Sequence, residues 1–288
     1  MFQPDANGSM NLTAEGVSVA YGRAMVVKDL DLAIPPGAFT ALIGPNGSGK
    51  STILRALGGL LAPMAGAVRL GGQSIAELST REIARRIGVL AQGPIAPEGL
   101  TVLDLVRQGR YPHLSLFGRR SERDDAACTE ALILTGMQEL AGRPLDSLSG
   151  GQRQRAWIAM TLAQETPILL LDEPTTFLDL AHQIEVMELV SGLVAERGKT
   201  VVAVLHDLNQ AARYANHIVL LKTGAIAATG GPAEVVSAEL IEHVFGVAVT
   251  VMRDPVAGTP MCIPLSQRRK LTPPAGEPLL HNDNRRAD

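Results

Sequence analysis

The chain has 288 residues, of which 46% are hydrophobic, 19% charged and 3% aromatic, and its formal net charge is −3. This composition is typical of a globular protein, and the slightly acidic balance gives no electrostatic indication of a nucleic-acid partner. No apolar run approaches the roughly 18 residues that span a bilayer, and the polar N-terminus lacks the layout of a signal peptide, so we expect a cytoplasmic protein.

The first segment predicts a disordered end followed by antiparallel strands. Residues 1–11 are polar and are expected to be disordered. From Leu12 to Ile34, short apolar runs on either side of the Tyr21-Gly22 turn predict the hairpin strands of a small antiparallel sheet. The ring of Tyr21 could form a stacking face for a base, although a core or surface tyrosine explains the residue equally well.

A phosphate-binding loop follows this sheet. The apolar run Phe39–Ile43 predicts a strand, and Ile53–Leu57 is apolar at helical spacing, so the loop leaves a strand and opens a helix. In that context its amides converge on an anion, Lys50 reaches the β- and γ-phosphates, Ser51 ligates Mg2+ and Thr52 lies near the α-phosphate. The residues of the loop are Gly44, Pro45, Asn46, Gly47, Ser48, Gly49, Lys50, Ser51 and Thr52. The sequence therefore predicts nucleoside triphosphate binding.

The next segment leads to an uncharged amide at a strand end. Residues Gly66–Leu70 predict a hairpin strand, and Ser79–Arg86 predicts a short helix whose arginines form a solvated face. Ile87–Ala91 predicts a buried strand that ends at Gln92. From that position Gln92 can sense both a metal-bound water and the Gly- and Pro-rich loop that follows.

A helical segment then interrupts the predicted α/β core. Apolar residues recur at helical spacing between Thr101 and Gly142, with a loop or kink at 109–120. We expect a small helical lobe, residues 93–160, inserted into the core, and its outer surface is a candidate docking site. Leu148, Ser149, Gly150, Gly151 and Gln152 open the last helix of this lobe. Exposed amides at a helix N-terminus predict a second anion site.

Two further strand ends carry polar side chains. Ile168–Leu171 is fully apolar and delivers Asp172 and Glu173 at its carboxyl end, where open α/β sheets bind their ligands. Asp172 can hold Mg2+ through water, and Glu173 can orient or deprotonate an attacking water. The alternative interpretation is a pair of carboxylates that cap a helix. The strand 200–205 ends at His206, which could donate to a γ-phosphate, although His206 by itself is more typical of a structural residue.

The remaining residues complete the fold. A turn reaches Asp179, Ile184–Val194 predicts a helix, and the hairpin strands 217–222 and 225–229 precede one helix over 233–245 and a short β-like end. The tail 266–288 is basic and Pro-containing, so it is expected to be disordered. Cys128 and Cys262 are too isolated for a metal site or a disulfide framework.

Together these motifs resemble the ATP-binding cassette (ABC) ATPases. The phosphate loop, Gln92, Leu148–Gln152, the Asp172-Glu173 pair, the turn at 176–179 and His206 occur in the order found in that family. The resemblance covers residues 12–265. It implies an α/β fold in which a P-loop nucleotide-binding core carries an antiparallel β subdomain and an inserted α-helical subdomain.

The resemblance also implies roles and partners. Tyr21 would stack on adenine, Glu173 would polarise water and His206 would hold the γ-phosphate. Gln92 would belong to the Mg2+ site together with Ser51 and Asp172, and would couple that site to a membrane partner. Residues 148–152 would complete the ATP site of a second copy of the chain, and Asp179 would lie at the dimer seam. The other implied partners are two transmembrane permease subunits and, indirectly, a periplasmic or lipoprotein substrate-binding protein.

Three stretches, 109–113, 151–160 and 172–183, are most similar to ATPases that import iron(III) siderophores, with haem and vitamin B12 importers as alternatives. Phe177 stands where such proteins often have Tyr or Trp. The resemblance implies a peripheral protein on the cytoplasmic face of the bacterial inner membrane. Two other classes stay open: a cassette ATPase that acts on nucleic acid or ribosomes, and an ATP-binding regulatory module without turnover.

Overall fold

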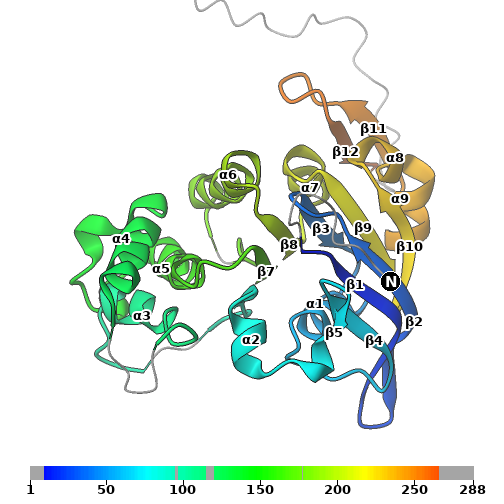
Figure 1. Ribbon diagram of the computed structural model, residues 1–288. Helices are drawn as coiled ribbons and strands as arrows, with labels where there is room; N and C mark the ends of the chain where they lie inside the picture. The colour runs from blue at the N-terminus through cyan, green and yellow to red at the C-terminus, as the bar shows by residue number, and fades with distance from the viewer. Residues whose placement is uncertain (1–9, 95–96, 115–119, 177, 266–288) are drawn as a thin grey trace, which may run out of the picture.

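The computed structural model describes residues 10–94, 97–114, 120–176 and 178–265. Its centre is a six-stranded sheet in the order β10-β9-β3-β8-β7-β6 (Figure 1). The strands are β3 (Phe39–Ile43), β6 (Ile87–Leu90), β7 (Ile168–Asp172), β8 (Thr200–Val204), β9 (His217–Lys222) and β10 (Ala225–Gly230). Neighbours pair in parallel except β9 and β10, which form an antiparallel hairpin. The parallel strands therefore point their carboxyl ends at one edge.

A second, antiparallel sheet has the order β2-β1-β4-β5. Its strands are β1 (Leu12–Tyr21), β2 (Ala24–Ile34), β4 (Ala65–Leu70) and β5 (Gln73–Ser74). The predicted hairpin is thus confirmed. Its strands are longer than the apolar runs suggest, because register shifts between Ala14 and Ala20 let β1 keep its pairing with β2 where the spacing of apolar residues is irregular. A separate hairpin, β11 (Val249–Arg253) with β12 (Pro260–Pro264), forms the β-like end.

Nine α-helices occur in the described part of the chain. They are α1 (Lys50–Leu57), α2 (Thr80–Ala84), α3 (Val102–Gln108), α4 (Glu122–Leu134), α5 (Gly150–Ala163), α6 (Leu180–Arg197), α7 (Leu208–Tyr214), α8 (Pro232–Val235) and α9 (Ala238–Phe245). Short 3-10 turns cover Ile75–Glu77, Gln138–Leu140 and Leu145–Ser147. Helices α2 to α5 each begin at a Ser or Thr whose side chain accepts an amide of the first turn, which explains where they start.

The central sheet is buried on both faces. In β3, Ala41 and Ile43 pack into one hydrophobic cluster with helices such as α5 and α6, while Leu42 packs into a second cluster with α1 and the antiparallel sheet. Because both faces are covered, β3, β7 and β8 have no polar alternation. Figure 1 shows α3, α4 and α5, in green, gathered on the opposite side of the core from the antiparallel sheet. This is the mixed α/β arrangement that the sequence predicts.

Some predictions need adjustment or fall outside the described residues. The single helix expected over 233–245 is two helices, because Val236 leaves the helical conformation and Ser237 caps α9. Helix α6 is longer than predicted at both ends. Phe177, the tail 266–288 and residues 1–9 of the N-terminal segment lie outside the described residues. None of the described helices is long and apolar enough to cross a membrane.

Candidate functional site

The phosphate loop connects β3 to α1 at the carboxyl edge of the sheet. Gly47 (φ 77°) and Gly49 (φ 96°) adopt the left-handed conformation, in which a side chain would be strained, so glycine is favoured at both positions. Gly49 is the N-cap of α1, and the helix starts at Lys50. The loop therefore ends where the free amides and the positive end of a helix dipole can meet an anion.

Lys50 is held against the rim of this loop. It is 6% exposed, and its Nζ donates to the carbonyl oxygens of Gly44 and Pro45 at 2.7 and 2.9 Å. Burial lowers the pKa of Lys50, and the carboxylates of Glu173 and Asp172 oppose that shift. An ammonium group held by two neutral carbonyls keeps its positive charge available for an anionic ligand.

Asp172 lies at the end of β7 beside the first turn of α1. Ser51 Oγ donates to Asp172 Oδ1 at 2.7 Å, and the carboxylate is 1% exposed. Its Oδ2 has no hydrogen-bond partner among the described residues, and its nearest cation is Arg55 at 3.9 Å. Burial raises the pKa of Asp172 despite the hydrogen bond from Ser51. A buried carboxylate oxygen without a partner indicates an incomplete site.

The donor set beside this orphaned oxygen fits Mg2+. No group of three or more His, Cys, Asp or Glu side chains in the described ranges could hold a metal by itself. Mg2+ is commonly bound by one or two protein oxygens together with substrate phosphates and water. Ser51 Oγ and Asp172 Oδ2 are oxygen ligands of that kind, next to a loop that fits phosphates.

Glu173 and His206 meet across the ends of two neighbouring strands. His206 Nε2 lies 2.8 Å from Glu173 Oε1, and Thr176 Oγ1 donates to Glu173 Oε2 at 2.9 Å. Burial raises the pKa of Glu173, but the hydrogen bonds from His206 and Thr176 outweigh it, so the net shift is downward. The residue also has φ 54°, a strained conformation of the kind that clusters at active sites. Helix α6 begins only at Leu180, so the two carboxylates do not cap a helix.

Lys50, Ser51, Glu173 and His206 line one cavity of about 460 Å3, whereas the buried Asp172 contacts it only through Ser51. Its lining residues are Val26, Asn46, Gly47, Gly49, Lys50, Ser51, Thr52, Gln92, Glu173, Thr176 and His206. Val26 and Thr176 are absent from the sequence-based assignment. Nothing in β2 distinguishes Val26, whereas Thr176 follows Glu173 by three residues, a spacing that lets its hydroxyl reach back to the carboxylate. Tyr21 does not line the cavity, and its side chain is 47% exposed.

The second predicted anion site is not part of this cavity. Ser149 caps α5, with its Oγ accepting from the amide of Gln152, while Gln152 Oε1 accepts from the amide of Ser149. Ser149 and Gly150 are exposed, and none of the residues 148–152 lines the cavity. Asp179 is also outside it and caps α6. One chain therefore carries two separate candidate phosphate sites, one in a cavity and one on its surface.

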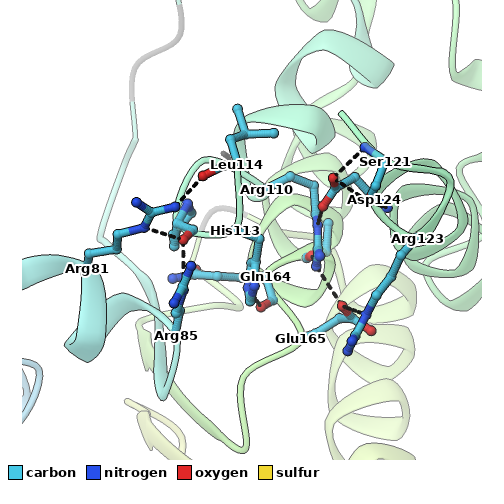
Figure 2. Close-up of polar contacts among 12 residues, drawn as sticks. Arg81, Arg85, Arg110, His113, Leu114, Ser121, Arg123, Asp124, Gln164 and Glu165 are labelled. Atoms are coloured by element: carbon cyan, nitrogen blue, oxygen red, sulfur yellow. Dashed lines mark hydrogen bonds and ion pairs between the residues drawn. The ribbon is translucent and has the colours of Figure 1, made fainter. Parts of the chain in front are cut away.

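The helical lobe is anchored by a buried cation (Figure 2). Arg110 is 1% exposed, and Figure 2 shows its guanidinium between α4 and the end of α5. It donates to Asp124 Oδ1 at 2.9 Å, to Ala163 O at 2.6 Å and to Glu165 Oε2 at 2.8 Å. The stretch 109–113, which is similar to siderophore importers, thus includes a residue that stabilises the lobe.

A second set of contacts in Figure 2 joins α2 to the lobe. The Nε atoms of Arg81 and Arg85 each donate to Pro112 O at 2.8 Å, and Arg81 also contacts Leu114 O. The prediction of a solvated arginine face is therefore incomplete: both side chains are exposed, but they also bind backbone carbonyls. His113 Nε2 lies 2.9 Å from Gln164 O, so the same turn also contacts the end of α5.

Comparison with known proteins agrees with this arrangement. The family model for the ABC transporter matches residues 27–176. The ferric enterobactin transport ATP-binding protein FepC of Escherichia coli K12 is 53% identical over 256 residues, which cover 89% of this chain and 94% of that protein.

Two solved structures show the same architecture. An inward-facing metal-chelate type ABC transporter gives a TM-score of 0.78 at 30% identity and covers 90% of this chain and 98% of its own. The dimeric bacterial ABC cassette MJ0796 gives a TM-score of 0.67 at 33% identity, covering 76% and 98%.

The family match spans more than half of the chain, and the similarity to FepC spans nearly all of it. The family match includes Lys50, Asp172 and Glu173. The chain is an ATP-binding ATPase that belongs to the ABC transporter family.

Proposed function

We propose that this protein is the ATP-hydrolysing subunit of an importer for iron(III)-siderophore complexes. The single observation that carries the proposal is the cavity lined by Lys50, Ser51 and the Glu173-His206 pair, with Asp172 hydrogen-bonded to Ser51 beside it. The similarity to a ferric enterobactin transport protein over nearly the whole chain supports the siderophore class. Haem and vitamin B12 are the alternative ligands.

The residues of the cavity divide into binding and reacting groups. Lys50 and the loop 44–52 bind the β- and γ-phosphates, and Ser51 and Asp172 hold Mg2+. When bound, Mg2+ neutralises charge that develops on the transferred phosphoryl group. Glu173 accepts a hydrogen bond from the attacking water, and its lowered pKa keeps it ionised at neutral pH for that purpose.

Three other residues act at the edges of this reaction. His206 donates to the γ-phosphate from the end of β8, and its contact with Glu173 positions both groups before the substrate binds. Gln92 lies on the cavity wall at the end of β6, immediately before the loop that leads to the helical lobe, so it links the Mg2+ site to that lobe. Tyr21 stacks on the adenine base outside the cavity.

Two copies of the chain complete each ATP site. The exposed N-terminus of α5, with the residues 148–152, binds the γ-phosphate of ATP held in the cavity of the other copy, and Asp179 lies at the seam between them. The observation that favours this arrangement is the separation of the two phosphate sites within one chain. The dimeric form of a similar cassette supports it.

The dimer acts on two transmembrane permease subunits at the cytoplasmic face of the inner membrane, with a periplasmic or lipoprotein substrate-binding protein that delivers the ligand. ATP closes the dimer, closure drives the permease, and hydrolysis resets the pair. The helical lobe, residues 93–160 of the cassette 12–265, provides the docking surface.

The test is reconstitution with the permease genes that neighbour this gene. The wild-type chain should co-purify with a multi-spanning permease and support ATP-dependent uptake of a ferric siderophore into vesicles, whereas the Glu173→Gln chain should bind ATP without uptake. Uptake of haem or vitamin B12 instead would favour an alternative ligand. Co-purification with nucleic acid or ribosomes would overturn the transport function, and ATP binding without phosphate release would favour a regulatory module.

A further inference from the structure

Two consecutive residues of α6, His182 and Gln183, contact three segments that are not connected to one another through the walls of the ATP cavity. These segments are the N-terminus of α5, the turn that ends at Asp179, and the start of α7 after His206. Neither His182 nor Gln183 lines the cavity. Both side chains are partly buried, so they are held between these segments rather than free in solvent.

The His182 ring packs directly against the backbone of Gly151. A methyl group added at Gly151 would lie 2.6 Å from His182 Cδ2 and 2.7 Å from Cγ, closer than any ordinary carbon contact. Gly151 is buried within the first turn of α5, where an alanine is conformationally allowed. An alanine at position 151 would therefore force the His182 ring to shift, although the backbone conformation allows the residue.

The same ring holds Asp179. His182 Nδ1 lies 2.6 Å from Asp179 Oδ1, and this oxygen also accepts from the amide of His182 at 3.0 Å. These two hydrogen bonds lower the pKa of Asp179. His182 thus fixes Asp179 relative to the N-terminus of α5.

Gln183 extends this link in the other direction. Its Nε2 donates to Leu178 O at 3.1 Å, and its Oε1 accepts from Gln210 Nε2 at 2.8 Å. Gln210 lies in the first turn of α7, whose cap, Asp207, directly follows His206. The turn before α6 is therefore tied to the segment that carries His206.

We infer that His182 and Gln183 are positioning residues that hold the α5 N-terminus, Asp179 and the His206 segment in a fixed relative arrangement. The inference rests on the proposed two-chain ATP site, in which these groups serve ATP bound by the partner copy as well as by their own. Groups that are already aligned lose less freedom when the two chains close on ATP. His182 and Gln183 therefore act on turnover and on closure, and leave the binding of ATP to a single chain unchanged.

The test is a four-chain comparison of wild type, Gly151→Ala, His182→Ala and the double variant. We expect His182→Ala to lower kcat roughly tenfold or more, because small misplacements of reacting groups are costly, with no change in the Kd of ATP for the single chain. Gly151→Ala should lower kcat by a larger factor in the wild-type background than in the His182→Ala background, since the ring that obstructs the methyl group is then gone.

Conservative and control variants separate positioning from folding. His182→Gln retains an amide donor for Asp179 and should recover part of the lost kcat, and Gln183→Leu should lower kcat without changing the Kd of ATP. Glu196→Ala, at the exposed far end of α6, is the matched control and should behave as wild type. Thermal unfolding of each chain verifies that it is folded.

Equal effects of Gly151→Ala in both backgrounds, or a His182→Ala chain with wild-type kcat, would overturn the inference. The proposed function is tested separately by ATP-dependent dimer formation of the Glu173→Gln chain. If this chain dimerises with ATP, and adding His182→Ala reduces the dimer fraction, the inference is supported. If the Glu173→Gln chain stays monomeric at saturating ATP, the two-chain site itself is wrong.

Discussion

Two buried aspartates, Asp124 in the helical lobe and Asp172 beside the ATP cavity, have opposite surroundings. Asp124 Oδ1 accepts from Arg110 at 2.9 Å, and Oδ2 accepts from the amide and hydroxyl of Ser121, each at 2.8 Å. Asp172 accepts only from Ser51, and its Oδ2 is without a hydrogen-bond partner in the described part of the chain. Both carboxylate oxygens of Asp124 thus have hydrogen-bond partners within the chain, whereas only one oxygen of Asp172 has such a partner in the described part of the chain.

The pKa values follow this difference. Burial acts to raise the pKa of both groups. For Asp124, the hydrogen bonds from Ser121 and Arg110 outweigh burial and lower the pKa to about 2. For Asp172 burial prevails, and the pKa is raised. A buried carboxylate with all of its hydrogen-bond partners stabilises the fold. A buried carboxylate with an unpaired oxygen can bind a ligand, but it lowers the free energy of unfolding while the ligand is absent.

The largest expected effect is on hydrolysis by Asp172→Asn. Loss of the carboxylate that we assign to Mg2+ should lower phosphate release by roughly a hundredfold or more, in the range typical of removing a key electrostatic group. The free energy of unfolding without nucleotide should stay equal or rise, because the variant removes a buried charge with few partners. Phosphate-release and urea-unfolding assays measure the two quantities. A large loss of stability would show that Asp172 is a structural residue like Asp124.

The next effect is on stability, through Arg110→Ala. This variant leaves the buried Asp124 without its cation, and breaking a buried pair in this way costs about 3–5 kcal/mol of unfolding free energy. Asp125→Ala is a matched control, since this neighbour is exposed and lies 3.9 Å from Arg107, and it should cost at most about 1 kcal/mol. Urea unfolding of both chains makes the measurement. Similar losses in the two variants would contradict the structural role of Arg110.

The smallest effect is the pH dependence of Asp124. Its pKa in the folded chain is about 2, below the ordinary value of 3.8, so its stabilising contribution is present above pH 3.8 and is lost as pH falls through 2. The difference in unfolding free energy between wild type and Asp124→Asn should therefore shrink between these pH values. Urea unfolding at several pH values in this window tests it, and a constant difference would show that the Asp124 pKa is not lowered.

Local signals predicted most of the fold and the residues of the cavity. The apolar run before Asp172, the glycines of the phosphate loop and the serine at position 149 each specify structure within a few residues, through strand burial, left-handed backbone and helix capping. The sequence also placed Glu173 and His206 at strand ends, but their contact depends on β7 and β8 being neighbours in the sheet, which only the tertiary structure decides.

Contacts between distant segments were not predictable in the same way. Val26 reaches the cavity from a strand with no distinguishing pattern, and Arg81 and Arg85 find Pro112 O only because α2 packs beside the lobe. The break between α8 and α9 depends on one residue, Val236, whose helix propensity is unremarkable among its neighbours.

The sequence alone determined the phosphate loop, the order of the motifs and the strand ends on which they lie, because backbone hydrogen bonding and side-chain periodicity act over short distances. Only the tertiary structure decided which buried carboxylates have all their hydrogen-bond partners, as Asp124 has and Asp172 has not. It also decided that the His182 ring packs against Gly151. The physical reason is that hydrogen-bond partners and steric contacts depend on how segments far apart in the chain pack together, and a local sequence pattern does not specify that packing.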